Sequence, residues 1–307
     1  MEKDYILGMD IGGTNFRMGL VDRSYHAWEI KVYPSSLIYR SGNTVDRFAD
    51  AIRQYLETCA KEKEVAAIAI GCPSVVDAQR RRLYSSTNFP GLENIDLVEE
   101  LEKRLDYKVY IEHDAYYLLA SDIRKYGLDP EETIVGCYFG TGLGAAMYIG
   151  GRPYIGKNGT ACELGHLPIP MNDYPCSCGN QGCIEMFSCG KALERLGKEN
   201  YPEDFIGDLF ALHGEEQVLR DFVEYMSVPV AAMANIMDPH HIILGGGLLQ
   251  MKGFPGEYLR ERVLAHTRKP YPAADLDLIF ADGEPEKGIV GAGIRAFQEL
   301  ERKRRTE

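Results

Sequence analysis

Short apolar runs alternate along this chain with longer segments in which apolar residues recur every three or four positions. The short runs are bounded by glycine or polar residues and have the length of buried β-strands. The longer segments have the period of amphipathic α-helices, and Asn43 stands where it would cap the first of them. The predicted strands are 5–10, 16–21, 65–71, 108–112, 133–139, 145–149, 241–244 and 276–281, and the predicted helices are 44–59, 95–105, 115–126, 218–237, 258–267 and 289 onward.

A strand–glycine turn–strand unit occurs twice, with about 130 residues between the two copies. The first copy contains Gly12-Gly13-Thr14, the second contains Gly140 to Gly144, and helices and further strands follow each. This repetition predicts a duplicated α/β fold of two lobes with a cleft between them. We expect a smaller N-terminal lobe over 1–114, joined by the C-terminal helix at 289–307, and a larger lobe over 115–288.

Length and charge narrow the class of protein. A chain of 307 residues is long for one hydrophobic core, which agrees with two lobes. Lys and Arg total 34 against 46 Asp and Glu, so the net charge of −12 disfavours nucleic acid and anionic membranes as partners. The sequence has no apolar run of the roughly 18 to 20 residues that span a bilayer, and its N-terminus lacks the features of a signal peptide. We therefore expect a cytoplasmic protein.

Three glycine turns are candidate nucleotide sites. Glycine lets the backbone approach a phosphate and direct N–H groups at it, and a nearby carboxylate can orient hydrated Mg²⁺. One glycine pair in a hairpin is more often structural, and neither a P-loop nor a full G-x-G-x-x-G is present, but three such turns together favour a nucleotide. The candidates are Asp10, Gly12, Gly13, Thr14 and Arg17 in the first turn, Gly140, Thr141, Gly142 and Gly144 in the second, and Gly245 and Gly246 in the third.

Four of the eight cysteines crowd together after a histidine. His166, Cys176, Cys178 and Cys183 would supply one imidazole and three thiolates, which is a closed tetrahedral set for Zn²⁺. A closed set leaves no position for a reacting water, so the predicted metal is structural and would hold the loop 166–185. The alternative is four unconnected residues in a polar loop.

These motifs resemble a known family. Asp10-x-Gly-Gly-Thr-x-x-Arg17 and Gly140-Thr-Gly-x-Gly144 are similar to the phosphate segments of the actin-like sugar kinases. The string from Gly165-His166 through Cys183 to Glu185 is similar to the zinc signature of the ROK family of bacterial repressors and sugar kinases. The resemblance implies an actin-like ATPase fold, related to ribonuclease H, whose two lobes close over a hexose and MgATP. It also implies a homodimer.

A kinase that acts on an alcohol needs a carboxylate to accept the hydroxyl proton. Asp10 and Asp114 are both candidates. Asp10 lies in a phosphate turn, where orienting a metal suits it better, so we assign the base to Asp114. The alternative role for Asp114 is a plain helix N-cap.

The same resemblance assigns the sugar contacts. Gly159 to His166 is similar to the family's Gly-x-Ala-Gly-Glu-x-Gly-His string, which implies that Glu163 and His166 contact the hexose. His166 would then bind zinc through one ring nitrogen and the sugar through the other. The further contacts implied are Glu185, Asn88, His113 and Asp114.

Three departures bear on specificity. The family usually has Asn where this chain has His113, and Gly where it has Cys162, and the second turn continues as Gly144-Ala145-Ala146. Segments after the cysteines, including 200–210 and 268–272, are similar to the allose kinases of the family. The resemblance therefore implies phosphorylation of the 6-hydroxyl of D-allose, with glucose or N-acetylmannosamine as the alternative. A sugar-responsive repressor is disfavoured, because only nine residues precede Asp10 and a DNA-binding segment would need more.

Overall fold

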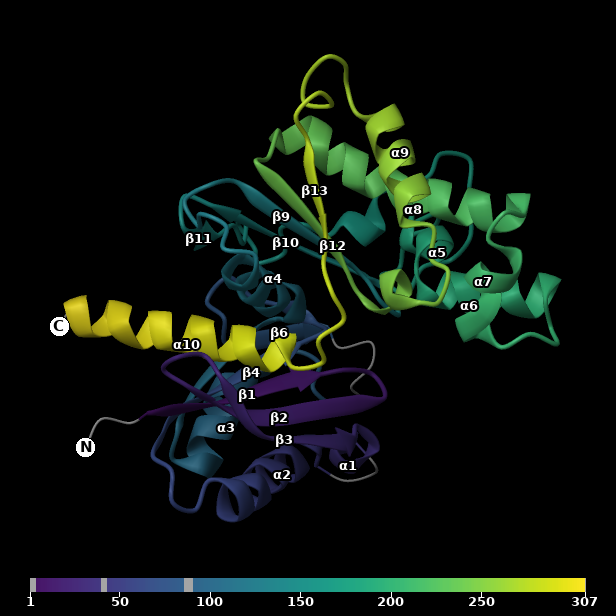
Figure 1. Cartoon of the computed structure of the whole chain (residues 1–307). Coiled ribbons are helices and arrows are strands. Elements are labelled where there is room, and N and C mark those ends of the chain that lie inside the picture. Colours follow the sequence, from purple (N-terminus) through teal and green to yellow (C-terminus); the bar gives the residue numbers. More distant parts are fainter. Residues whose placement is uncertain (1–3, 40–42, 86–90, 307) are drawn as a thin grey trace. The chain divides into compact units, whose positions relative to one another are not determined.

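The computed structural model describes residues 4–39, 43–85 and 91–306 and separates into two compact units, each drawn in Figure 1. The first unit comprises Met1–Gly127, Ile155–Ala161 and Glu284–Glu307. The second comprises Leu128–Tyr154 and Cys162–Gly283. Each unit has its own sheet and hydrophobic core.

The first unit is built on a five-stranded sheet in the order β3-β2-β1-β4-β8, beside a small three-stranded sheet in the order β5-β6-β7. Its strands are β1 (Tyr5–Ile11), β2 (Asn15–Asp22), β3 (Ala27–Pro34), β4 (Val65–Cys72), β5 (Val75–Val76), β6 (Arg82–Ser85), β7 (Ile95–Asp96) and β8 (Lys108–His113). Its helices are α1 (Ser36–Tyr39), α2 (Thr44–Cys59), α3 (Leu97–Leu105), α4 (Asp114–Lys125) and α10 (Lys287–Thr306).

The two faces of the first sheet carry side chains of different size. Alternate residues of β1, such as Leu7 and Met9, join the core beneath α2 and α3. The opposite face has small residues, and a Cβ added at Gly8 would lie 2.5 Å from the carbonyl oxygen of Ile289 in α10. This close approach brings α10 against β1, as Figure 1 shows, and Asp10 lies on the same face of β1 as Gly8.

The second unit repeats this arrangement. Its sheet has the order β11-β10-β9-β12-β13, in which an antiparallel hairpin is followed by two parallel strands, as in the first sheet. Its strands are β9 (Ile134–Phe139), β10 (Leu143–Ile149), β11 (Arg152–Pro153), β12 (His241–Gly245) and β13 (Asp277–Phe280). Its helices are α5 (Glu185–Ser188), α6 (Gly190–Asn200), α7 (Leu209–His213), α8 (Gln217–Met237) and α9 (Gly256–His266), with 3₁₀ turns η1 (Leu164–His166), η2 (Ile206–Asp208) and η3 (Gly247–Gln250).

The division of the chain differs from the expected boundary after residue 114. Helix α4 belongs to the first unit, because it packs on α10 so closely that a Cβ at Gly291 would lie 1.8 Å from the carbonyl oxygen of Tyr117. A buried ion pair between Lys287 and Asp122 also joins these two helices, with 2.5 Å between Nζ and Oδ1. Within the described ranges, no helix has both the length and the apolar character needed to cross a membrane.

Candidate active site

Asp10 ends the apolar part of β1 and lies opposite Arg17 in the β1–β2 hairpin, with 3.4 Å between Oδ2 and Nη1. Gly288 at the start of α10 leaves room for this carboxylate, since a Cβ there would lie 2.7 Å from Cγ of Asp10. Burial, and then the nearby charge of Asp114, raise the pKa of Asp10 to about 6 against the opposing effect of Arg17. Asp10, predicted to orient a metal ion, and Asp114, predicted as the base, are therefore electrostatic neighbours within the first unit.

Hydrogen bonds donated to its carbonyl oxygens hold the first glycine turn in place. Ser35 Oγ donates to the Gly12 oxygen at 2.7 Å, and the Tyr39 hydroxyl donates to the Gly13 oxygen at 2.7 Å. The backbone N–H of Ser35 donates to the Thr14 oxygen at 2.9 Å. Gly13 and Thr14 are themselves exposed. The turn thus presents a fixed backbone to solvent, as a phosphate site requires.

Asp114 is the first residue of α4, and His113 is its N-cap. The plain N-cap role is therefore filled by the neighbouring residue, whose Nδ1 accepts the N–H of Ala115 at 3.3 Å. Oδ1 of Asp114 accepts the same N–H at 2.8 Å, which fixes the orientation of the carboxylate. Burial raises the pKa of Asp114, while His113 and this hydrogen bond oppose the rise. A carboxyl group with a raised pKa and a fixed orientation is suited to accept a proton.

The second glycine turn is shorter than predicted. Leu143 and Gly144 pair with Phe139 and Tyr138, so Gly144 lies in β10 rather than in the turn. The tight turn is Gly140–Gly142, closed by the Gly140 N–H donating to the Gly142 oxygen at 2.9 Å. The first residue of α6, Gly190, donates to the Gly140 oxygen at 2.8 Å, and Thr141 is exposed at the tip.

The third glycine turn follows β12 and is explained in part by packing. Gly246 has a φ of +98°, and a Cβ there would lie 2.4 Å from the carbonyl oxygen of Phe139. A Cβ at Gly245 would lie 2.9 Å from the ring of Tyr138. Both glycines are therefore required by the close approach of the β12 end to β9, whatever else they bind.

Four predicted metal ligands come together in the second unit. The ligand atoms of His166, Cys176, Cys178 and Cys183 all lie within 4.8 Å of one another. Cys178 and Cys183 have their sulfurs 3.7 Å apart, and Nδ1 of His166 is 3.6 Å from the sulfur of Cys176. A tetrahedral zinc ion with Zn–S bonds of about 2.3 Å would hold sulfur ligands roughly 3.8 Å apart. The residues fit a zinc ion, and the interpretation as four unconnected residues is wrong.

The predicted sugar contacts of the second unit surround this cluster. Nε2 of His166 lies 3.7 Å from Oε2 of Glu163, on the side of the ring away from the cysteines. Oε1 of Glu185 is 3.4 Å from the sulfur of Cys176, and the same side chain lies against Gly142 and Gly165. Glu185 thus stands between the metal cluster and the second glycine turn.

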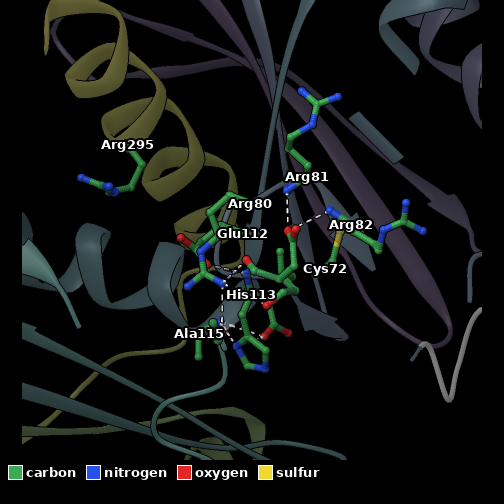
Figure 2. Close-up of polar contacts among 12 residues, drawn as sticks. Cys72, Arg80, Arg81, Arg82, Glu112, His113, Ala115 and Arg295 are labelled. Carbon is green, nitrogen blue, oxygen red and sulfur yellow. Dashed lines mark hydrogen bonds and ion pairs between the residues drawn. The ribbon is translucent and has the colours of Figure 1, made fainter. Parts of the chain in front are cut away.

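Cys162, which replaces the family's glycine in the glutamate string, has a φ of +67°. This is the left-handed region that glycine adopts most readily, so the backbone keeps the conformation although the residue has changed. Asn88 lies outside the described residues. Sequence reasoning missed Glu112 and Arg80, which form a buried ion pair beside His113, as Figure 2 shows. The only sequence signal for them is the run of three arginines at 80–82.

Comparison with known proteins identifies relatives of this chain and of its fold. A profile of the ROK family matches residues 6–299. The chain is 27% identical to a glucokinase of Thermotoga maritima over 95% of this chain and 97% of the relative. It is 31% identical to an N-acetyl-D-glucosamine kinase of Pectobacterium atrosepticum over 78% of this chain and 83% of the relative. A ROK family glucokinase from Streptomyces griseus, solved with glucose and AMPPNP, superposes with a TM-score of 0.80 at 23% identity, covering 96% of this chain and 99% of the other. The predicted actin-like ATPase fold is thereby confirmed.

Proposed function

The chain belongs to the ROK family, and we propose that it is an ATP-dependent kinase that phosphorylates the 6-hydroxyl of a hexose. The observation that carries this proposal is the pair of neighbouring carboxylates in the first unit, one in a glycine turn and one at the head of α4. The named relatives are a glucokinase and an N-acetyl-D-glucosamine kinase, which supports a sugar as the acceptor.

In this proposal Asp114 is the catalytic base. It accepts the proton of the 6-hydroxyl as the hydroxyl oxygen bonds to the γ-phosphorus and the bond to the β-phosphate oxygen of ATP breaks. Phosphoryl transfer is otherwise a matter of position and charge. The Asp114 carboxylate has a fixed orientation because it accepts the Ala115 N–H. This suits the role of base, since a base must lie within hydrogen-bond reach of one particular hydroxyl.

ATP is proposed to bind at the glycine turns. The exposed backbone at Gly13 and Thr14 would hold phosphate oxygens, with the exposed Thr141 doing the same in the second unit. Asp10 would orient the hydration shell of Mg²⁺, whose charge neutralises that of the phosphates when it is bound. Gly245 and Gly246 remain the candidates for the nucleoside end.

The pKa of Asp10 makes this role dependent on pH. Below about pH 6 the folded protein holds Asp10 protonated, so we expect kcat/KM for MgATP to fall on acidification through that range. Stability changes in the opposite direction, because the folded-state pKa of about 6 lies above the ordinary value of 3.8. The free energy of unfolding of the wild type, relative to Asp10→Asn, should decrease by about 2 kcal/mol between pH 4 and pH 7. Urea denaturation across that interval measures it, and parallel pH profiles of the two proteins would contradict it.

The cysteine cluster is proposed to bind a structural zinc ion. Its four protein ligands close the coordination sphere, so the ion would supply rigidity rather than a reacting water. With Nδ1 of His166 on the metal, Nε2 is left as a donor or acceptor for a sugar hydroxyl beside Glu163. Glu185 is the second carboxylate proposed for the sugar.

For the sugar itself we propose D-allose, with glucose, N-acetylglucosamine and N-acetylmannosamine as the alternatives. The support is His113, which stands where the family usually has Asn. Because Nδ1 accepts the Ala115 N–H, the neutral ring carries its proton on Nε2 and has one donor to offer. An asparagine amide would offer both a donor and an acceptor, and so would suit a different arrangement of hydroxyls.

His113→Asn is therefore expected to lower the ratio of kcat/KM for allose to that for glucose by roughly tenfold or more, since a polar site discriminates against a sugar that leaves its groups unpaired. Steady-state kinetics on both sugars measure this ratio. Tyr84→Phe, a change at an exposed side chain of the same unit, serves as the control. An unchanged ratio would remove His113 from the account of specificity.

The proposed function is tested by a coupled ADP-release screen over hexoses and N-acetylhexosamines at fixed MgATP. We expect sugar-dependent release, greatest with allose, and a product phosphorylated at C6 by NMR. Greater turnover with glucose or N-acetylglucosamine would make that sugar the substrate in place of allose, and the proposed kinase activity would stand. ATP hydrolysis independent of every sugar would contradict the function. A homodimer is part of the proposal, and light scattering on the purified protein tests it.

A further inference from the structure

Arg80 and Glu112 form a buried ion pair that has no part in the function proposed above. Nη2 of Arg80 lies 3.0 Å from Oε1 of Glu112, and the side chains are only 16% and 8% exposed. Arg80 lies in the loop between β5 and β6, and Glu112 lies in β8, two residues before Asp114. In Figure 2 the Arg80 side chain points to Glu112, whereas those of Arg81 and Arg82 point away.

The same guanidinium also binds backbone oxygens at the start of its own loop and in the segment 155–161. Nη1 of Arg80 donates to the oxygens of Val76 and Asp77 at 3.2 and 3.3 Å and to the oxygen of Gly159 at 3.0 Å. Its Cζ atom lies 5.6 Å from the ring centre of Tyr116 in α4. One side chain therefore contacts the β5–β6 loop, the end of β8, α4 and the segment 155–161.

Arg80 occupies a backbone position where an arginine is uncommon. Arg80 has a φ of +55°, a region that favours glycine or asparagine. The loop that imposes this conformation is built by Asp77, whose Oδ1 accepts the N–H groups of Arg81 and Arg82 at 2.7 and 2.9 Å. Asp77 closes the loop by itself, so the contacts of the Arg80 guanidinium are additional to those that the loop conformation needs.

Gly159 is fitted closely to this loop. It has a φ of +86°, and a Cβ there would lie 2.4 Å from the Val76 oxygen and 2.6 Å from the carbonyl carbon of Asp77. Gly159 opens the string that leads, four residues later, to Glu163. The start of the sugar string and the strand that ends at the base are thus both bound to Arg80.

We propose that Arg80 is a positioning residue that fixes the end of β8, and with it Asp114, relative to the start of the sugar string at Gly159, and so determines how effectively the hexose is bound and phosphorylated. This inference rests on the proposed function. It follows from geometry, since one guanidinium forms an ion pair with Glu112 through Nη2 and donates to the Gly159 oxygen through Nη1. A displacement of about 1 Å at a reacting group can cost on the order of 100-fold in rate.

The experiment compares Arg80→Met with Arg82→Met, the same change two residues away, where the guanidinium donates to the backbone and side-chain oxygens of Asn94. We expect Arg80→Met to lower kcat/KM for the hexose by on the order of 100-fold, with KM for ATP unchanged and Arg82→Met like the wild type. Hydrogen exchange at the amides of 159–161 should be faster in Arg80→Met alone. Equal kinetics and equal exchange in the two variants would overturn the proposal.

A second variant separates positioning from stability. Arg80→Met leaves a buried carboxylate without its partner and should lower the melting temperature, whereas adding Glu112→Gln removes that charge and should restore it. The proposal requires the double variant to remain defective towards the hexose although its stability has recovered. Recovery of kcat/KM together with stability would show a purely structural pair and overturn it. If the wild type phosphorylates no sugar, the proposed function fails, and unchanged exchange at 159–161 would still be a separate failure of the Arg80 inference.

Discussion

Asp114→Asn is expected to lower kcat by roughly 10²- to 10⁴-fold, the range that a positioned general base contributes. The amide cannot accept the hydroxyl proton, so the attacking oxygen must lose it to solvent. The change is otherwise small, because an Asn oxygen can accept the Ala115 N–H just as Oδ1 of Asp114 does at 2.8 Å. Sugar binding should therefore persist, which isothermal titration with the hexose measures.

Asp114→Asn should lower turnover without lowering the stability of the fold. Burial raises the pKa of Asp114, so the folded state opposes the charged form, and the wild type loses stability as pH rises through the shifted pKa. A neutral Asn does not carry that penalty, and Asp114→Asn should melt at the same temperature or higher at pH 7. A gain in stability with a loss of turnover is expected where a buried charge is kept for its proposed role in catalysis rather than for folding.

Asp106→Asn is the matched control, since Asp106 is an exposed residue with a left-handed φ of +53° that Asn also adopts readily. It should leave turnover unchanged. Substantial turnover in Asp114→Asn would move the base to another residue, with Asp10 the next candidate because the two carboxylates influence each other. A loss of sugar binding in Asp114→Asn would mean that the carboxylate acts in binding rather than in proton transfer.

Elements with a clear period could be predicted from the sequence, and pairing between strands could not. The helix 44–59 was found to its last residue, and Asn43 caps it, with its side chain accepting the N–H of Val45. The strand β3 was missed although Trp28, Ile30 and Val32 alternate, because it lies at the edge of its sheet with these side chains half exposed. Gly144 was placed in a turn because glycine usually marks one, whereas its pairing with Tyr138 makes it part of β10.

Some features of the candidate site could likewise be predicted from the sequence, and others could not. The convergence of His166 with the three cysteines could be predicted, because their spacing within one loop already limits their geometry. The pKa of Asp10 could not, since it depends on burial and on Asp114, which is distant in sequence. Arg80 and Glu112 were missed for the same reason, because only the folded unit brings the β5–β6 loop to the end of β8.

Removal of the metal is expected to have the second large effect. The loop 166–185, which the structure describes throughout, contains no helix or strand between η1 and α5. Its two sides are joined by backbone hydrogen bonds such as Ile169 N–H to the Gly182 oxygen at 2.7 Å and Ile184 N–H to the Leu167 oxygen at 2.9 Å. A bound zinc ion would therefore contribute much of the loop's rigidity, since its binding energy becomes folding energy. Cys183→Ala should lose the metal, lower the melting temperature and raise KM for the hexose by roughly 10- to 100-fold, the usual consequence of disturbing the groups around a metal site.

The effect should be larger for the sugar than for ATP, because His166 belongs to the cluster and Glu185 touches it, whereas Asp10 and the first glycine turn lie in the other unit. The second glycine turn borders Glu185, so a smaller rise in KM for ATP is expected. Cys59→Ser, at a half-buried cysteine of the first unit, is the matched control and should keep one zinc per chain by elemental analysis. Chelation of the wild type should reproduce the Cys183→Ala kinetics, and added zinc should reverse them. Protein shown to be free of metal, yet unchanged in melting temperature and in KM for the hexose, would mean that the loop holds His166 and Glu185 without the ion.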